Sequence, residues 1–225
     1  MRPCVIIPTY NEAKTIASLI KQVISLGFKI VVIDDGSTDF TADIAQTSSA
    51  TVLRNIKNLG KGAALVKGYN FAVAQGFDAV ISMDGDGQHE PSDLAVFVER
   101  AESSNCGVVI GNRMTTISQM PILRILTNRF MSWLISLITG QNIADTQCGF
   151  RLVRSEILRK IILSTTKYET ESEILIRAAR LGFKIESVPV KTIYSGQKSQ
   201  INPFVDTLRF IRFIFSEFMR NCLHV

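Results

Sequence analysis

The stretch DAVISMDGDGQHEP, residues 78–91, joins a short apolar run to two carboxylates with a single glycine between them. The run at 79–83 has no charged residue and stops at Asp84, which is typical of a buried strand. Asp84 and Asp86 repel each other unless a cation lies near both, and Gly85 allows a turn that faces them to one side. The stretch therefore predicts a strand that ends in a cation site, although a solvated Asp-Gly turn fits the same residues.

Apolar runs and amphipathic segments alternate on both sides of this stretch. We expect strands at 4–7, 29–33, 51–53, 79–83, 107–110 and 184–190. We expect helices at 12–26, 38–47, from the turn NLGKGAA (58–64) to 75, at 121–140, at 172–181 and from 204 onward, and a loop leading into a helix at ADTQCGFRLVR (144–154). This alternation predicts an α/β fold, in which a Rossmann-like, mostly parallel sheet carries helices on both faces.

Polar segments follow several of these strands. In such sheets, ligands bind at the carboxyl ends of the strands, and PTYNE (8–12), DDGST (34–38) and DGDGQ (84–88) fall at three of these ends. Carboxylate and amide oxygens on a loop suit Mg²⁺ or Mn²⁺, and magnesium sites commonly add substrate phosphates to one or two carboxylates. The sequence therefore favours a metal that binds a diphosphate at Asp84, Asp86 and Gln88.

Three further residues at these strand ends suit contacts with a nucleotide. Tyr10 offers a flat face for stacking on a base or ribose, and Glu12 can accept hydrogen bonds from ribose hydroxyls. Asp35 can accept a hydrogen bond from a nucleobase N–H group. Each has a structural alternative, because Asn11 and Glu12 also suit the start of a helix and Asp35 can act as a helix cap.

Several protein classes are disfavoured by what the sequence lacks. The GKG turn at 60–62 matches neither a Walker A loop nor GxGxxG, which argues against a kinase or dehydrogenase and leaves Lys61 as a substrate contact or a plain turn lysine. Four cysteines without CxxC spacing and only two histidines argue against a zinc site and a disulfide framework. With 46% hydrophobic residues among 225, we expect one globular core.

Charge is unevenly distributed along the chain. Residues 1–112 hold 9 Lys and Arg against 12 Asp and Glu, whereas residues 113–225 hold 16 against 8. A basic half suits an anionic membrane surface or nucleic acid, or is merely a solvated basic face. Because the chain has no recognisable groove-reading motif, we expect no nucleic-acid partner.

Six segments occur along the chain in this order: VIIPTYNEAKTI, VVIDDGSTDFTADIA, NLGKGAALVKGYNFA, DGDGQHEP, GNR and DTQCGFRLVR. Together they resemble the family 2 glycosyltransferases of the GT-A fold, in particular dolichyl-phosphate mannose synthase and bacterial polyprenyl-phosphate glycosyltransferases. The resemblance covers nearly the whole chain and is strongest over residues 3–155. It implies a metal-dependent inverting transferase that moves a sugar from a UDP- or GDP-sugar to a dolichyl- or undecaprenyl-type polyprenyl phosphate.

The resemblance also implies which residues form the site. Contacts with the nucleotide sugar are expected from Pro8, Tyr10, Glu12, Asp35, Lys61, Asp84, Gly85, Asp86, Gln88, Arg113, Arg129 and Lys198. The expected metal ligands are Asp84, Asp86 and Gln88, with Asp84 nearer the sugar or ribose than the other two. The expected catalytic residues are Asp86, Arg113, Asp145 and Arg151, among which Arg113 would balance phosphate charge. Asn128 and Arg129 are expected near the acceptor phosphate, and Lys198 and Ser199 in a loop that closes over the donor.

The acceptor decides the role of Asp145, which the resemblance puts on the acceptor side. A hydroxyl nucleophile usually needs a base, and Asp145, Glu171 or Glu173 would then take the proton. A lipid phosphate is already an anion near neutral pH, so Asp145 would instead position groups or metal, or would only cap the next turn. A hydroxyl acceptor on a growing glycan and a non-catalytic nucleotide-sugar-binding module therefore remain as alternatives, although the complete metal motif argues against the second.

Two segments suit a position on a membrane surface, although no run of about 20 apolar residues would span one. Residues 121–140 are apolar with two arginines, no acid and the only Trp. Residues 204–220 form a basic amphipathic pattern, with Phe213 as an exception on the polar side. We therefore divide the chain into a GT-A domain at 1–203 and a C-terminal basic amphipathic helix at 204–225.

The expected location follows from the same segments. No signal-peptide pattern precedes the first strand, so we expect a cytoplasmic protein that is peripheral at the inner face of the membrane. The alternative is that these segments pack against the domain, a membrane-protein partner or a second copy of the chain.

Overall fold

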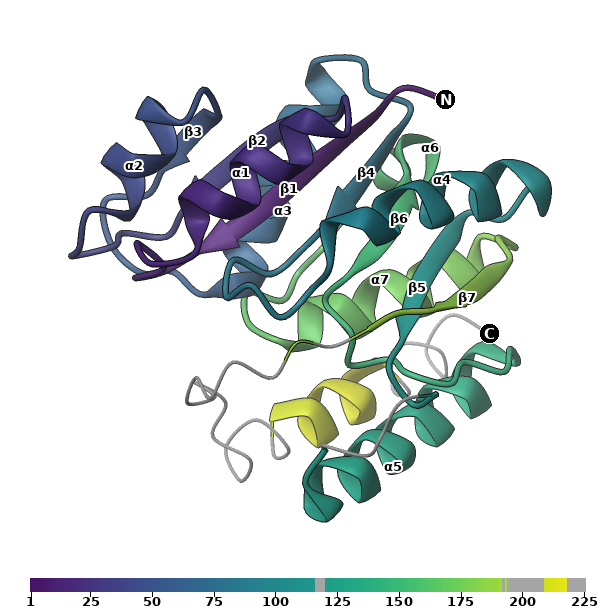
Figure 1. Cartoon of the computed structure of the whole chain (residues 1–225). Coiled ribbons are helices and arrows are strands. Elements are labelled where there is room, and N and C mark those ends of the chain that lie inside the picture. Colours follow the sequence, from purple (N-terminus) through teal and green to yellow (C-terminus); the bar gives the residue numbers. More distant parts are fainter. Residues whose placement is uncertain (116–119, 192, 194–208, 218–225) are drawn as a thin grey trace.

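The computed structural model describes residues 1–115, 120–191, 193 and 209–217, which form a seven-stranded sheet with helices packed on it (Figure 1). The strands are β1 Pro3–Thr9, β2 Lys29–Asp34, β3 Thr51–Arg54, β4 Ala79–Ser82, β5 Val108–Asn112, β6 Arg151–Arg154 and β7 Ile185–Pro189. They lie in the order β3-β2-β1-β4-β6-β5-β7, and β6 is antiparallel to both of its neighbours. The other pairs are parallel, so the expected mostly parallel α/β sheet is confirmed.

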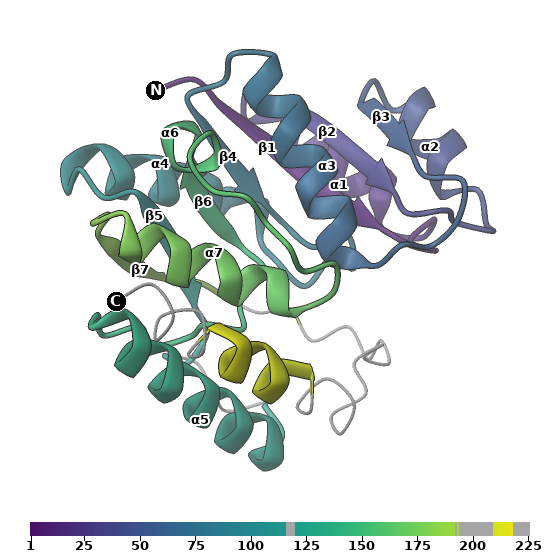
Figure 2. The same cartoon turned by 180° about the vertical axis from the view of Figure 1, so that it is seen from behind.

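Helices cover both faces of the sheet (Figures 1 and 2). The helices α1 Ile16–Ser25 and α4 Leu94–Ser103 lie on one face, and α3 Lys61–Ala74 and α7 Glu169–Arg180 lie on the other. The short elements are α2 Thr41–Thr47, the 3-10 turn η1 Pro91–Asp93 and α6 Ser155–Leu158. Two helices, α5 Ile122–Thr139 and the one at 209–217, lie together beside α7 on the side where β7 ends the sheet.

The covered sheet explains why its strands have apolar runs without alternation. All four residues of β4 are buried, as are residues 4–7 of β1 and 30–34 of β2. A strand that is buried on both faces has no position for a solvated side chain. Polar groups therefore gather where the strands end, and β1, β2 and β4 end at the same edge because they are parallel.

The largest differences from the sequence-based expectation among the helices concern α1 and α4. The first helix begins at Ile16 and not at residue 12, because residues 12–15 form a turn in which the backbone N–H of Thr15 donates to the carbonyl of Glu12. Residues 94–103 form α4, for which we predicted no element. Its buried residues Leu94, Phe97 and Ala101 follow a helical spacing, so the signal was present in the sequence.

The segment 144–154 differs most from the prediction. We expected a loop leading into a helix, whereas Arg151–Arg154 forms β6, in the middle of the sheet. Leu152 pairs with Ile81 of β4 and with Val109 of β5. Because β6 runs antiparallel to β4, its first residue, Arg151, lies opposite Ser82, the last residue of β4. The loop before β6 is therefore brought to the edge of the sheet that carries Asp84.

The helix at 209–217 packs one face on the domain and leaves the other face exposed. Phe213, expected on the polar side, is buried, as is Phe210, so that expectation is wrong for a physical reason: this face packs on the domain. Glu217 is also buried and pairs with Arg180 of α7. Ile211 and Phe215 are exposed. The remainder of the expected C-terminal helix, at 204–208 and 218–225, lies outside the described residues.

In the part of the chain that the structure describes, no helix combines the length and the apolar character needed to cross a membrane.

Candidate active site

The site begins at the turn that follows β4. Gly85 lies so close to the end of β1 that an added Cβ would be 2.8 Å from the Thr9 methyl group, so a side chain does not fit there. The Thr15 hydroxyl donates a 2.6 Å hydrogen bond to the carbonyl of Gly85. The turn that carries Asp84 and Asp86 is thereby held against the start of the first helix.

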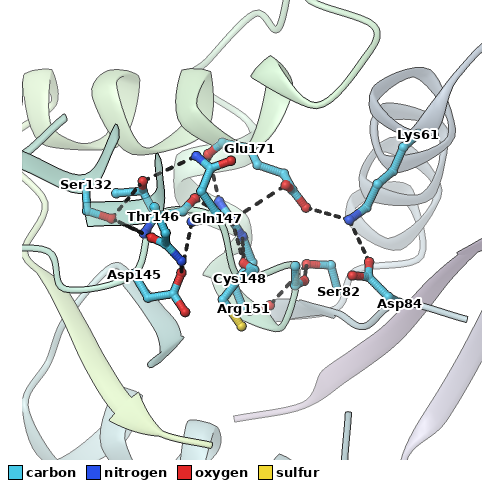
Figure 3. A network of polar contacts seen from close by, with 12 residues as sticks. Lys61, Ser82, Asp84, Ser132, Asp145, Thr146, Gln147, Cys148, Arg151 and Glu171 are labelled. Carbon is cyan, nitrogen blue, oxygen red and sulfur yellow. Dashed lines mark hydrogen bonds and ion pairs between the residues drawn. The ribbon is translucent and has the colours of Figure 1, made fainter. Parts of the chain in front are cut away.

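The two carboxylates of this turn have different surroundings. Asp84 Oδ1 lies 2.6 Å from the Lys61 ammonium (Figure 3). Its Oδ2 lies 3.5 Å from His89 Nε2. An added Cβ at Gly149 would be 2.6 Å from both carboxylate oxygens, so the loop before β6 passes directly beside Asp84. Burial favours the neutral acid, but Lys61 and His89 outweigh it and lower the pKa of Asp84 below its usual range. Asp84 is therefore an ionised carboxylate with a partner on each oxygen.

Asp86, by contrast, forms no ion pair with the residues that the structure describes. It accepts a 3.0 Å hydrogen bond from the backbone N–H of Gln88. Burial and the nearby charge of Asp84 raise the pKa of Asp86. Burial and the charge of Asp86 likewise raise the pKa of Glu12 to about 7. These two acids thus share a region of uncompensated negative charge.

The donor set of this region fits a hard divalent cation. The charges of Asp86 and Asp84 both raise the pKa of Glu12, so the three carboxylates lie near one another, and Gln88, with its amide oxygen, follows Asp86 by two residues. Among the described residues, no three His, Cys, Asp or Glu side chains are grouped closely enough to form a metal cage by themselves. Such a set suits Mg²⁺ or Mn²⁺ that completes its coordination with substrate phosphates.

The raised pKa of Glu12 predicts how stability depends on pH in metal-free buffer. The folded chain binds this proton more tightly than the unfolded chain, so the stabilisation is full below the ordinary pKa of 4.5 and is lost as pH rises through about 7. We expect the free energy of unfolding to fall by about 1–2 kcal/mol between these limits, less than the full shift because the side chain is partly exposed. Urea titrations at a series of pH values between these limits measure the change. Glu12→Gln should flatten the dependence of the unfolding free energy on pH, and an unchanged slope would assign this dependence to other groups.

Asp35 lies at the end of β2, where it holds the turn that precedes α3. Its Oδ1 accepts hydrogen bonds from Asn55 Nδ2 at 2.8 Å and from the backbone N–H of Leu59 at 3.0 Å. Its Oδ2 accepts one from the backbone N–H of Gly60 at 2.7 Å. Asp35 is buried, so in this conformation it shapes the turn next to Lys61. Pro8 and Tyr10, both partly exposed, lie beside it at the end of β1.

A second cluster lies on the other side of the loop before β6. Asp145 Oδ2 accepts a 2.8 Å hydrogen bond from Arg113 Nε, and its Oδ1 accepts one of 3.0 Å from an Arg113 terminal nitrogen. Asn128 of α5 donates to the same Oδ1 at 2.8 Å. Burial opposes the charge on both groups, but the pairing prevails, so the pKa of Asp145 is lowered and that of Arg113 is raised. Asp145 thus balances the positive charge of Arg113 and fixes the orientation of its guanidinium.

Arg151 is fully buried and connects the two clusters. Its guanidinium donates hydrogen bonds to the carbonyl oxygens of Cys148 at 2.6 Å and Glu171 at 2.7 Å, and more weakly to Thr146 at 3.4 Å. Figure 3 shows the resulting chain of contacts from Lys61 and Asp84, through Glu171 and Arg151, to the loop that begins at Asp145. Arg151 therefore sets the path of this loop.

The structure brings most of the expected residues to one edge of the sheet. Those at this edge are Pro8, Tyr10, Glu12, Asp35, Lys61, Asp84, Gly85, Asp86, Gln88, Arg113, Asp145 and Arg151. Arg129 is exposed on α5, one residue after Asn128. Lys198 and Ser199 lie outside the described residues.

Sequence reasoning missed one residue and considered two others only as bases. His89, which contacts Asp84 and packs on the Phe150 ring, follows Gln88 directly in DGDGQHEP, so its position was visible. Glu171 binds Lys61, a contact between residues far apart in sequence that no local pattern indicates. Glu173 accepts hydrogen bonds from Ser164, Thr165 and Arg177 and holds the loop before α7.

Comparisons with known proteins give a family and named relatives. Residues 4–162 match the family described as Glycosyl transferase family 2. The undecaprenyl-phosphate mannosyltransferase of Micrococcus luteus is 31% identical over 84% of this chain and 83% of its own length. The UDP-N-acetylglucosamine–dolichyl-phosphate N-acetylglucosaminyltransferase of Methanococcus voltae is 29% identical over 84% of this chain and 85% of its own.

Solved structures give the same fold. Glucosyl-3-phosphoglycerate synthase of Mycobacterium tuberculosis, crystallised with Mn²⁺, UDP and glucosyl-3-phosphoglycerate, superposes with a TM-score of 0.73 at 20% identity. The match covers 98% of this chain and 79% of that one. The sheet and helices described above are thus those of the GT-A fold.

Proposed function

The chain belongs to glycosyl transferase family 2, and from this premise we propose that it moves a sugar from a nucleoside diphosphate sugar to a polyprenyl phosphate, with inversion and with a divalent metal. The observation that carries the proposal is the pair of acids Glu12 and Asp86, whose charges have no counter-ion among the described residues. This pair lies at the carboxyl ends of β1 and β4, where ligands bind in open α/β sheets.

Each part of the donor site has a role in this proposal. Asp86 and Gln88 would hold Mg²⁺ or Mn²⁺, while Asp84 stays paired with Lys61. The metal would supply positive charge against the negative charge that develops on a leaving diphosphate. Pro8 and Tyr10 would form the wall against the nucleoside, next to the turn that Asp35 fixes. The crystallised complex of the Mycobacterium tuberculosis synthase with Mn²⁺ and UDP supports this assignment.

The buried acids near the acceptor side are already engaged in hydrogen bonds and ion pairs, which favours a phosphate acceptor over a sugar hydroxyl. Asp145 has a lowered pKa and accepts hydrogen bonds from Arg113 and Asn128, so it is a poor proton acceptor. Glu173 is similarly engaged, and Glu171 is paired with Lys61. A lipid phosphate brings its own anionic oxygen and needs no such base. In this reading Asp145 positions Arg113 and Asn128 toward the acceptor.

The printed names of the relatives support a lipid-linked acceptor. The Micrococcus luteus protein is named for undecaprenyl phosphate and the Methanococcus voltae protein for dolichyl phosphate. Both share more than four-fifths of their own length with this chain. We therefore place an undecaprenyl- or dolichyl-type phosphate beside Arg113 and Asn128, with Arg129 at the open side of α5.

The outer face of α5 supports a position on a membrane surface. It carries an apolar stripe, here called the α5 stripe, whose side chains are between 52% and 76% exposed: Ile122, Leu123, Leu126, Phe130, Trp133 and Leu137. The neighbouring helix at 209–217 adds exposed Ile211 and Phe215. No acid occurs between Glu102 and Asp145, so this face suits the headgroup region of an anionic bilayer. The opposite face of α5 carries Asn128, so the same helix would meet both the bilayer and the acceptor site.

Charged substitutions on the α5 stripe test this assignment. Leu126→Glu with Trp133→Glu should lower binding to vesicles of anionic lipid at least tenfold in flotation assays, because both apolar contacts and charge attraction are lost. Both side chains are exposed, so the thermal midpoint should stay within about 2 °C of wild type. Ile162→Glu is the matched control, since Ile162 is 82% exposed and lies outside α5 and the helix at 209–217. Equal loss in the control, or full binding by the double variant, would contradict the assignment.

One transfer assay tests the reaction itself. The purified chain, polyprenyl phosphate and Mn²⁺ or Mg²⁺ are mixed with one labelled UDP- or GDP-sugar at a time. Label in the organic phase that disappears with chelator is the expected result, and it identifies the donor. Metal-dependent transfer only to added sugar hydroxyls would replace the lipid acceptor by a glycan. Absence of turnover with every donor would contradict the proposal.

A further inference from the structure

Lys61 is held by two carboxylates from distant parts of the fold. Its ammonium lies 2.6 Å from Asp84 Oδ1 and 3.0 Å from Glu171 Oε1 (Figure 3). The Tyr168 ring centroid lies 6.0 Å from the same nitrogen. Burial opposes the charge, but both carboxylates raise the pKa of Lys61 above its usual range. The lysine is therefore charged, and its charge is already balanced by the carboxylates of Asp84 and Glu171.

The backbone around Lys61 fixes it in this position. Gly60 has a φ of 103°, and an added Cβ at Gly62 would lie 2.1 Å from the Thr170 hydroxyl oxygen. The Ala63 N–H donates to the carbonyl of Thr166. The first turn of α3 is thus packed directly on the start of α7, which carries Glu171. This packing leaves Lys61 little freedom to turn away from its two partners.

We propose that Lys61 is a positioning residue: its ammonium pairs with both Asp84 and Glu171 and so holds the Asp84 carboxylate in place. Asp86, and not Asp84, is then the carboxylate offered to the metal. The inference rests on the proposed function, since it concerns the same metal site. It differs from the expectation that Lys61 contacts the nucleotide sugar. With Lys61 removed, Asp84 would lose its main partner, and its repulsion from Asp86 and Glu171 would displace it.

Nucleotide binding with and without metal separates the two roles of Lys61. Calorimetric titrations with UDP and with GDP are run in EDTA and in Mn²⁺ for the wild type, Lys61→Met and Lys61→Arg. A positioning role predicts that Lys61→Met leaves the affinity in EDTA within twofold of wild type but lowers the affinity in Mn²⁺ by about 10-fold or more. A direct contact with the diphosphate predicts an equal loss in both buffers, and that result would overturn the inference.

Turnover gives a second readout that a purely structural role would not produce. Lys61→Met should lower kcat by about 10- to 100-fold with little change in the KM of the donor at saturating metal, and Lys61→Arg should recover most of the loss because a guanidinium can bind both acids. Glu171→Gln keeps the lysine and should give a smaller fall in kcat, which protects the test if Lys61→Met folds poorly. Wild-type kcat in both Lys61→Met and Glu171→Gln would also overturn the inference.

The controls keep this inference apart from the proposed function. Lys21→Met makes the same chemical change at an exposed position of α1 and should match wild type in every assay. If the wild type bound neither nucleotide in Mn²⁺, the proposed function itself would fail. If the wild type bound and turned over while Lys61→Met lost affinity equally in EDTA and in Mn²⁺, only the positioning role would fail.

Discussion

Asp86→Asn is expected to lower sugar transfer by about 1,000-fold or more, with no loss of stability. The amide keeps the size of the side chain and an oxygen that can accept from the Gln88 N–H, but it removes the charge that would hold the metal. Burial and Asp84 raise the pKa of Asp86, which means that its charge destabilises the folded chain at neutral pH. Removing that charge should leave the free energy of unfolding equal to that of wild type or slightly higher.

The measurement combines the organic-phase transfer assay with urea unfolding at pH 7.5. Asp43→Asn serves as control, because Asp43 is an exposed acid of α2 away from the site. The urea titration is then repeated with Mn²⁺ in the buffer. Mn²⁺ should raise the free energy of unfolding of the wild type but not that of the Asp86→Asn variant. Turnover at the wild-type rate in Asp86→Asn would show that the metal is held elsewhere.

Asp145→Leu is expected to cost about 3–5 kcal/mol of folding stability, because it leaves the Arg113 guanidinium buried without a counter-charge. Four donor groups lose their acceptor at once: the Arg113 side chain, the Arg113 backbone N–H, the Asn128 amide and the Gln147 backbone N–H. Each buried donor that is left unpaired adds to the cost. Chemical denaturation with urea measures the change, and activity should fall to background.

The double variant Arg113→Met with Asp145→Leu shows how much of the lost stability comes from the unpaired charge and how much from altered packing. Removing both charges should restore more than half of the lost stability, because the unpaired cation is gone. Sugar transfer should stay at background, since the cation that Asp145 orients is also gone. A double variant no more stable than Asp145→Leu alone would show that the cost comes from shape and not from charge.

The parallel part of the sheet and the edge that carries the site were predictable from the sequence. Buried parallel strands need continuous apolar runs, and 4–7, 29–33 and 79–83 have them. The acids that follow such runs must lie at one edge, because parallel strands end together. Local chemistry and topology therefore sufficed to predict that Glu12, Asp84 and Asp86 lie close together.

Contacts between distant segments were not predictable in the same way. β6 contains only Leu152 and Val153 between two arginines, which is too short to show a period, and its strand character comes from pairing with β4 and β5. The partners of Asp145 and Lys61 depend on this pairing and on the packing of α3 against α7. Phe213 is a similar case, since a helical wheel does not show which of two apolar sides meets the domain.

The position of β6 has a consequence for synthesis of the chain on the ribosome. The strands β1 to β4 can pair as soon as they emerge, but β4 and β5 are neighbours in sequence that never touch, because β6 lies between them. Until residue 154 has left the exit tunnel, the nascent chain holds a half-sheet with an apolar, unpaired edge at β4. Sealing of this edge and assembly of the acceptor side are then a single late event, since the strand that seals the edge carries Arg151 and is preceded by the loop that begins at Asp145.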